Sequence, residues 1–231
     1  MTGAFISEIY ASVQGEGPYA GERQIFVRLA GCPLRCAYCD TPGSLTARGH
    51  QRSTVKEAMA QVLRLARRRS IRTVSVTGGE PLTQPLFLKD FLRELKKRKF
   101  RTYLETAGIH PDALRTVVGY VDVVSMDMKL PSATGKGYWK EHAAFLKTGG
   151  KKVFVKIVLE MKSKQAEIKK ALKILSPARP APLLVLQPVT PIPGQVKGPS
   201  ADQVADAYAL ASRALPRVLV IPQQHKLWEA R

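Results

Sequence analysis

The sequence lacks a membrane-length apolar run, a leader-like start and a low-complexity tail. None of its apolar stretches approaches the ~20 residues that a membrane helix needs. Residues 1–8 contain no basic stretch followed by an apolar run, so no secretory signal peptide is expected. Acidic residues are scarce, with 18 against 37 basic ones and a formal net charge of +19. We therefore expect a soluble, cytoplasmic protein whose basic surface favours anionic ligands or partners.

Cysteine is also scarce, and the three cysteines of the chain all lie between positions 32 and 39. An odd number of cysteines cannot close into a complete set of intramolecular disulfides. In a reducing cytosol, such a group indicates metal ligands or redox chemistry instead.

Strand-like and helix-like segments alternate along the chain. Strands are predicted at 5–13, 25–29, 73–77, 101–105, 121–126, 153–159, 183–186 and 218–221. Apolar spacing predicts helices at 55–66, 85–98, 110–118, 138–146, in a segment capped by Ser163, and at 201–214. Alternation of this kind predicts an α/β fold with a parallel sheet. Since a full eight-unit barrel needs ~250 residues, we expect a single domain over 1–231: a partial, open (βα) TIM-type barrel of about six strands.

The distinctive polar residues follow strands directly. They are the cysteine loop 32–39, Gly78 to Glu80, Glu105 and Thr106, Asp127 and Lys129, and Gln187. The carboxyl ends of parallel strands meet at one rim, where ligands bind in such folds. The sequence therefore predicts one ligand site at this rim.

The spacing of Cys32, Cys36 and Cys39 places three thiolates on one short loop. Most iron–sulfur clusters are held by four thiolates, so three on a 4Fe–4S cluster leave one iron open. S-adenosylmethionine (SAM) could chelate that iron, and one electron from the cluster would then cleave it to methionine and a 5′-deoxyadenosyl radical. The alternative is a zinc site. Zinc would need a fourth ligand, which could come from His50, His110, His142 or His225.

The CxxxCxxC loop, with Tyr38 before its last cysteine, resembles that of the radical SAM superfamily. Gly78-Gly79-Glu80-Pro81 resembles the superfamily's GGEP motif, which grips the SAM amine. The resemblance implies a 4Fe–4S cluster on the three cysteines, which are the expected catalytic residues, and SAM as the second cofactor. It implies that SAM binds Gly79, Glu80, Ser125, Lys129 and Gln187.

The chain as a whole resembles the 7-carboxy-7-deazaguanine synthase family. The matching segments are 12–17, 39–41, 105–108, 125–129 and 222–226. The glycines at 15 and 17 also match a dinucleotide-binding pattern, but Pro18 and Gly21 break the helix that such a motif must open. The resemblance implies conversion of 6-carboxy-5,6,7,8-tetrahydropterin to 7-carboxy-7-deazaguanine by hydrogen abstraction, ring contraction and loss of ammonia. This lyase reaction belongs to queuosine biosynthesis, a tRNA modification pathway.

The same resemblance implies a substrate site that the C-terminal segment 216–231 closes. Its residues would be Gln14, Glu16, Arg28, Thr77 and His225. Arg28 offers a fork for the substrate carboxylate, and Gln14 and Glu16 could pair with the pterin edge. Thr41 would ligate Mg²⁺, which prefers oxygen ligands. We also expect a homodimer, with no membrane partner and no direct contact with nucleic acid. The net charge of +19 and the need for electrons predict an acidic electron donor such as flavodoxin.

Two alternatives of other kinds remain open at this stage. One is another radical SAM enzyme, such as a glycyl-radical activase, which would keep the cluster and lose the pterin site. The other is a basic RNA-binding protein with a structural metal site. The basic runs, such as 67–69 and 96–99, fall mostly at ends of predicted helices, where solvated charge is ordinary. We also expect the positive surface to attract an acidic electron donor.

Overall fold

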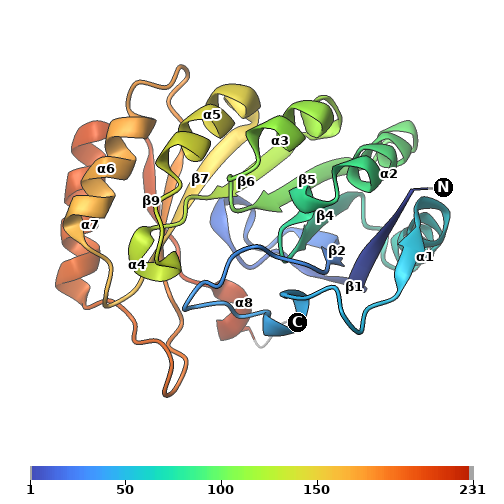
Figure 1. Ribbon diagram of the computed structural model, residues 1–231, viewed down its shortest axis with the longest axis horizontal. Coiled ribbons are helices and arrows are strands. Elements are labelled where there is room, and N and C mark those ends of the chain that lie inside the picture. Colours follow the sequence, from blue (N-terminus) through green and yellow to red (C-terminus); the bar gives the residue numbers. More distant parts are fainter. Residues whose placement is uncertain (1, 229–231) are drawn as a thin grey trace.

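The computed structural model describes residues 2–228, which form an open, nine-stranded sheet wrapped by helices (Figure 1). The strand order is β3-β1-β2-β4-β5-β6-β7-β8-β9. The neighbouring strands β2, β4, β5, β6, β7, β8 and β9 run parallel to one another. Strand β1 is antiparallel to both β2 and β3. The strands are β1 (Gly3–Val13), β2 (Arg23–Leu29), β3 (Arg52–Thr54), β4 (Thr73–Gly78), β5 (Arg101–Thr106), β6 (Val123–Asp127), β7 (Val153–Leu159), β8 (Leu184–Pro188) and β9 (Val218–Val220).

The longer helices lie in an arc along the outer side of the sheet, and two four-residue helices, at 131–134 and 224–227, lie apart from that arc (Figure 1). The helices are α1 (Val55–Arg69), α2 (Pro85–Lys97), α3 (Pro111–Val117), α4 (Pro131–Thr134), α5 (Trp139–Gly149), α6 (Gln165–Leu175), α7 (Ala201–Ala214) and α8 (Gln224–Leu227). A capping box begins α1, since the side chains of Thr54 and Glu57 each accept a hydrogen bond from the other residue's backbone N–H. Within the described residues, no helix is both long enough and apolar enough to cross a membrane.

The two faces of the sheet differ in chemistry, because successive side chains of a strand point to opposite faces. The outward face packs against the helices through aliphatic residues such as Val76, Leu104, Met126 and Ile157, all fully buried. On the inward face, Tyr103 and Phe154 pack against Tyr19 and form an aromatic floor inside the barrel. Nearer the carboxyl ends of the strands, the inward positions are polar, and this layer forms the site described below.

The expected α/β partial barrel is confirmed, and the parallel strands number seven within residues 2–228 rather than about six. The short elements β3, α4 and α8 were not predicted. The expected cap at Ser163 is wrong: α6 begins one residue later than such a cap allows, with Lys164 at its N-cap. The Ser163 hydroxyl instead accepts a hydrogen bond from the backbone N–H of Glu160, 3.0 Å away.

Candidate active site

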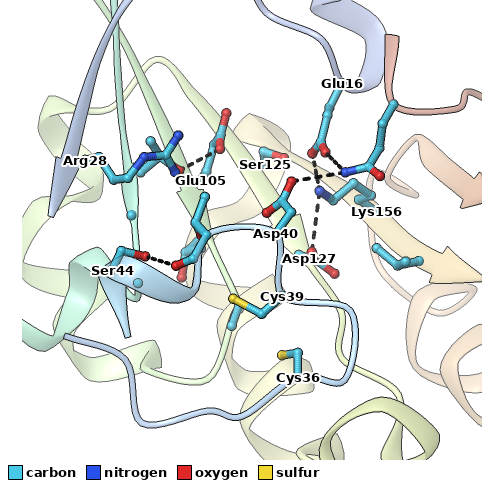
Figure 2. A pocket seen from close by; sticks show the side chains of 18 of the residues that line it. Glu16, Arg28, Cys36, Cys39, Asp40, Ser44, Glu105, Ser125, Asp127 and Lys156 are labelled. Atoms are coloured by element: carbon cyan, nitrogen blue, oxygen red, sulfur yellow. Dashed lines mark hydrogen bonds and ion pairs between the residues drawn. The ribbon is translucent and has the colours of Figure 1, made fainter. Parts of the chain in front are cut away.

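One large pocket opens at the carboxyl ends of the strands (Figure 2). Its empty volume is about 1270 Å³, part of it open to solvent. The lining includes most of the residues predicted from the sequence: Gln14, Glu16, Arg28, Cys32, Cys36, Cys39, Thr41, Thr77, Gly79, Ser125, Lys129, Gln187 and His225.

The cysteine loop lies along one side of this pocket, and all three thiols are free and half-buried. Backbone hydrogen bonds hold the loop in place: the Cys32 amide donates to Leu45 over 3.1 Å, and the Ala37 amide to Ala133 over 2.9 Å. Figure 2 shows the sulfur atoms of Cys36 and Cys39 pointing to the same side of the loop. Burial raises the pKa of Cys32 and Cys36. Such thiols need a bound cation to become thiolates at neutral pH.

The spacing of the sulfur atoms fits a cluster better than a single zinc ion. Four thiolates around one zinc at ~2.3 Å lie about 3.8 Å from one another. Within residues 2–228, the one group of three potential ligands whose atoms all lie within 4.8 Å is Glu16, Asp40 and His225. At least one pair of the three cysteine sulfurs is therefore more than 4.8 Å apart, which is wider than a zinc tetrahedron allows. A four-iron cluster, being larger than one ion, suits three separated thiolates.

The glycine pair at the end of β4 brings its backbone against the cysteine loop. A Cβ atom on Gly79 would lie 2.4 Å from the Gly31 carbonyl oxygen and 2.8 Å from that of Ser44, so no larger residue fits without a shift. Glu80 is fully buried behind this wall. Its carboxylate accepts hydrogen bonds from the backbone N–H of Leu82 and Ala107 and from the Thr106 hydroxyl. In this structure Glu80 therefore anchors the glycine pair, and its contact with a SAM amine stays a prediction.

Several buried polar atoms on the pocket wall have no hydrogen-bond partner within the described chain. They are the Tyr38 hydroxyl, Asp127 Oδ1 and Gln187 Oε1. Buried polar groups are nearly always hydrogen-bonded, so these atoms fit a polar ligand with both donors and acceptors. SAM carries an ammonium, a carboxylate and ribose hydroxyls, and meets this description. Ser125 stands two positions before Asp127 on β6, so its side chain faces the same side of the sheet and lines the same wall.

Lys129 supplies a buried cation near the cysteines. Its ammonium lies 2.7 Å from Asp127 Oδ2 and 4.9 Å from the centre of the Tyr38 ring. Burial opposes its charge, but the Asp127 carboxylate raises the pKa of Lys129 well above its usual value. The side chain therefore stays protonated and suits a carboxylate ligand, as predicted for SAM.

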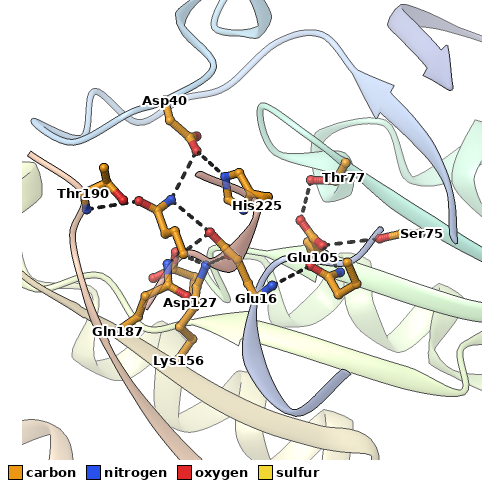
Figure 3. Close-up of polar contacts among 12 residues, drawn as sticks. Glu16, Asp40, Ser75, Thr77, Glu105, Asp127, Lys156, Gln187, Thr190 and His225 are labelled. Carbon is orange, nitrogen blue, oxygen red and sulfur yellow. Dashed lines mark hydrogen bonds and ion pairs between the residues drawn. The ribbon is translucent and has the colours of Figure 1, made fainter. Parts of the chain in front are cut away.

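The loop between β1 and β2 carries Gln14 and Glu16 into the pocket from the opposite side. Tyr19 packs on the aromatic floor and fixes this loop inside the barrel. The Gln14 side chain donates to Glu105 over 2.8 Å, and Glu16 accepts from Gln187 over 3.0 Å. Both predicted substrate ligands are thus held by polar partners, and Figure 3 shows Glu16 beside Gln187 and Lys156.

Arg28 and Thr77 lie side by side on the inward face, since they are paired in the register of β2 and β4. Arg28 donates to Glu8 over 2.8 Å and to the Tyr10 hydroxyl over 2.7 Å. Thr77 donates to Glu105 over 2.8 Å. Arg28 therefore forms the edge of the pocket that a substrate carboxylate would meet, with Glu105 nearby to accept from donors of the substrate.

The C-terminal segment reaches over the pocket through α8. His225 Nε2 lies 3.8 Å from Asp40 Oδ2, and the Gln224 amide donates to the Gly15 carbonyl over 2.8 Å. Thr41 follows Asp40 at the start of a 3-10 turn, and its hydroxyl makes no capping hydrogen bond there. The described part of the predicted closing segment 216–231 thus contacts the site, whereas residues 229–231 lie outside the described chain.

Several residues of the network were not predicted to belong to the site. They are Asp40, Lys156 and Gln223, which line the pocket together with Glu105 and Asp127, two expected rim residues to which no role was assigned. Asp40 stands within the matching segment 39–41 and Gln223 within the matching segment 222–226, so each carried a usable signal. Lys156 carried none, because it lies within an otherwise apolar strand.

Comparison with known proteins gives a consistent result. The sequence matches the radical SAM superfamily over residues 27–177. It is 34% identical to the 7-carboxy-7-deazaguanine synthase of Geobacter sulfurreducens, over 97% of this chain and 96% of that one. It is 35% identical to the Methanopyrus kandleri protein of the same name, over 97% and 93%. The fold resembles a crystal structure of QueE from Escherichia coli, with a TM-score of 0.67, 21% identity, and 95% and 94% of the two chains covered.

Proposed function

The chain belongs to the 7-carboxy-7-deazaguanine synthase family of the radical SAM superfamily, and we propose that it converts 6-carboxy-5,6,7,8-tetrahydropterin to 7-carboxy-7-deazaguanine. The observation that carries this proposal is the meeting of two sets of residues in one pocket. Three free thiols line one side, and the polar set built on Gln14, Glu16, Arg28 and Glu105 lines the other. A glycyl-radical activase or a structural zinc protein needs no such second set.

The cofactor side comprises the cysteine loop and the ends of β4, β6 and β8. Cys32, Cys36 and Cys39 would hold a 4Fe–4S cluster, with SAM bound by Gly79, Glu80, Ser125, Lys129 and Gln187. When bound, the cluster and SAM together supply a one-electron cleavage whose radical product takes a hydrogen atom from the substrate. The protein's own part is to exclude water and hold the partners in line. Half-buried cysteines and a fully buried Glu80 wall support that role.

The substrate side would recognise a pterin that bears a carboxylate. Arg28 is charged at any physiological pH and offers planar donors to that carboxylate. Glu16 and Glu105 are acceptors for the amino and ring N–H groups of the pterin. Burial opposes the charge on Glu16, but Lys156 holds the pKa of Glu16 below its usual value, so it stays ionised. Thr77 and His225 would complete the contacts, from β4 and from the C-terminal segment.

We further propose that Thr41 ligates Mg²⁺ together with oxygen atoms of the substrate and of water. Hard hydroxyl and carboxylate oxygens suit this ion, which keeps several waters in most protein sites. Two groups on the pocket wall support this proposal. The Thr41 hydroxyl makes no capping hydrogen bond to its 3-10 turn, and the Asp40 carboxylate is its neighbour in the chain. Burial opposes the charge on Asp40, but the nearby His225, Lys156 and Lys226 lower its pKa to about 2, so it is an anion.

The decisive test is a product assay under anoxic conditions. Reconstituted protein, a reductant, SAM and the carboxy-tetrahydropterin should yield 7-carboxy-7-deazaguanine, identified by its mass. Omission of Mg²⁺ should slow product formation. Reduced protein that cleaves SAM but leaves the pterin unchanged would overturn the proposed substrate.

An acidic redox protein is the electron donor that we propose for this enzyme, because the chain carries a net charge of +19. Opposite charges steer association, and salt screens that attraction. Reduction by a flavodoxin should therefore slow steeply as salt is added. A rate that is indifferent to salt would argue against steering. We also keep the expected homodimer and cytoplasmic location as proposals; the reducing cytosol suits three free thiols.

A further inference from the structure

Lys156 lies at the centre of the polar network, between the cofactor side and the substrate side of the pocket. It occupies an inward position of β7, and its side chain is 10% exposed. The ammonium forms an ion pair with Glu16 Oε2 and lies 3.4 Å from Asp127 Oδ2 (Figure 3). Asp127 and Lys156 are neighbours in the register of β6 and β7, so the strand pairing itself brings them together.

A lysine in this position needs its two carboxylates. Moving an ammonium out of water is costly unless it is paired and hydrogen-bonded. Burial opposes the charge of Lys156, but Glu16 and Asp127 raise its pKa above the usual value. Lys156 is therefore a fixed cation and is unsuited to act as a base.

The contacts of Lys156 connect the two sides of the pocket. Lys129, on the cofactor side, is bound to Asp127 over 2.7 Å. Asp127 contacts Lys156, which pairs with Glu16 on the substrate side. Alternating charges thus run from the cysteine loop to the β1–β2 loop, as Figure 2 shows for Glu16, Lys156 and Asp127.

Glu16 depends on this lysine for its position. Its other oxygen, Oε1, accepts from the Gln187 and Gln223 amides at 3.0 and 3.1 Å. Those donors are neutral, so within the described chain Lys156 is the cation that directly contacts the Glu16 carboxylate. Without that cation, a buried carboxylate would keep its desolvation cost and lose its compensation, and it would turn toward water.

We propose that Lys156 is a positioning residue that locks the Glu16 carboxylate against the barrel wall and thereby fixes the pterin relative to SAM. This inference rests on the proposed function. It predicts that loss of Lys156 loosens the substrate while the cofactor side keeps working. We expect SAM cleavage to be uncoupled from product formation: SAM is still cleaved, but fewer cleavage events lead to deazaguanine.

The experiment compares Lys156→Met with Lys156→Arg and with Lys169→Met, a control at an exposed position on α6. The measured quantities are the ratio of deazaguanine to 5′-deoxyadenosine and the KM values of pterin and SAM. In Lys156→Met the ratio should fall at least about tenfold, because misplacement of a reacting centre by 1 Å can cost up to about 100-fold. The KM of the pterin should rise while that of SAM changes little. Lys156→Arg should restore part of the ratio, and the control should match the wild type.

A double variant tests whether the effect runs through Glu16. Glu16→Gln alone should lower the ratio, and adding Lys156→Met to it should change the ratio little more, since residues in one network are not additive. If Lys156→Met does not fold, Glu16→Gln and Lys156→Arg carry the same comparison.

Two outcomes separate this inference from the proposed function. If the wild-type enzyme makes product and the Lys156→Met variant keeps the wild-type ratio of deazaguanine to 5′-deoxyadenosine, the role of Lys156 is refuted and the proposed function stands. A parallel loss of SAM cleavage and product in a folded variant would also refute that role, because that pattern indicates a general structural defect. A wild-type protein that cleaves SAM and forms no deazaguanine would refute the proposed function and this role together.

Discussion

Ion pairs occur in two settings in this molecule, the inner wall of the sheet and the outer ends of the helices. On the inner wall, the side chains of Lys129, Lys156, Asp127 and Glu16 are 10–20% exposed. On the outside, Arg115 and Asp112 also lie 2.7 Å apart, but their side chains are 68% and 88% exposed. The distances are alike, so the surroundings and not the contact geometry distinguish the two kinds of pair.

The difference in exposure determines how much each ion pair contributes to stability. An exposed pair is worth about 0–1 kcal/mol, because water and salt already solvate both charges. A buried charge that loses its partner costs roughly 3–5 kcal/mol. Inner-wall charges must therefore be kept or removed together, whereas outer charges can vary one at a time. The following predictions test this contrast and begin with the largest expected effect.

Cys36→Ala should abolish SAM cleavage altogether while leaving the fold intact. The residue supplies one of three thiolates and lies on a loop that backbone hydrogen bonds hold in place. The iron content of reconstituted protein and the 5′-deoxyadenosine yield measure the effect, with a circular dichroism melt as the control for folding. Retention of cleavage by the variant would disprove the ligand assignment.

Asp127→Asn should destabilise the fold by about 3–5 kcal/mol, since it removes the carboxylate shared by two buried lysines. Although burial opposes its charge, Lys129 and Lys156 lower the pKa of Asp127, so the native side chain is an anion at neutral pH. Urea unfolding measures the change. A loss below about 1 kcal/mol, the value of an exposed pair, would erase the contrast between the inner wall and the outer shell.

Gly15→Ala should disturb the closing segment without touching a charge. A Cβ atom on Gly15 would lie 2.4 Å from His225 Cβ and Nδ1, so α8 must shift outward. We expect the KM of the pterin to rise about tenfold, in line with the cost of misplacing a contact residue, and SAM cleavage without substrate to stay unchanged. Gly21→Ala is the matched control for space, since no atom lies within 4 Å of its Cβ position. Its positive φ adds local strain only.

Much of the fold and part of the site could be predicted from the sequence, and the reasons differ. Alternating segments such as 153–159 and 201–214 matched the observed elements, because their apolar pattern is local. Cys32 to Cys39 and the Gly78–Glu80 segment were found because their motifs are contiguous. Lys156 was missed because its partners stand 29 and 140 positions away in the chain, at Asp127 and Glu16. Only the strand register and the β1–β2 loop bring those residues together.

The pair of Lys96 and Asp122 lies between the two settings, with side chains 37% and 36% exposed. Burial opposes the charge on Asp122, but hydrogen bonds from Lys96 and Thr102 lower its pKa. Because the folded pKa is the lower one, the ionised carboxylate stabilises the fold above its unfolded pKa, and that stability is lost as the pH falls below about 4. Asp122→Asn should therefore flatten the acid limb of unfolding free energy against pH, by less than about 1 kcal/mol. An unchanged acid limb would count against the pair.

Asp112→Asn should have the smallest effect of the series. Within the described chain, its carboxylate forms an ion pair with Arg115, and it lies in the first turn of α3. Both the pair and the helix dipole are screened there, so the loss should stay below about 1 kcal/mol and shrink further in high salt. The same urea titration that serves Asp127→Asn measures it. If the loss is as large as that of Asp127→Asn, or persists at high salt, then exposure does not determine how much an ion pair contributes to the free energy of unfolding. Burial would then not explain why Glu16 depends on Lys156.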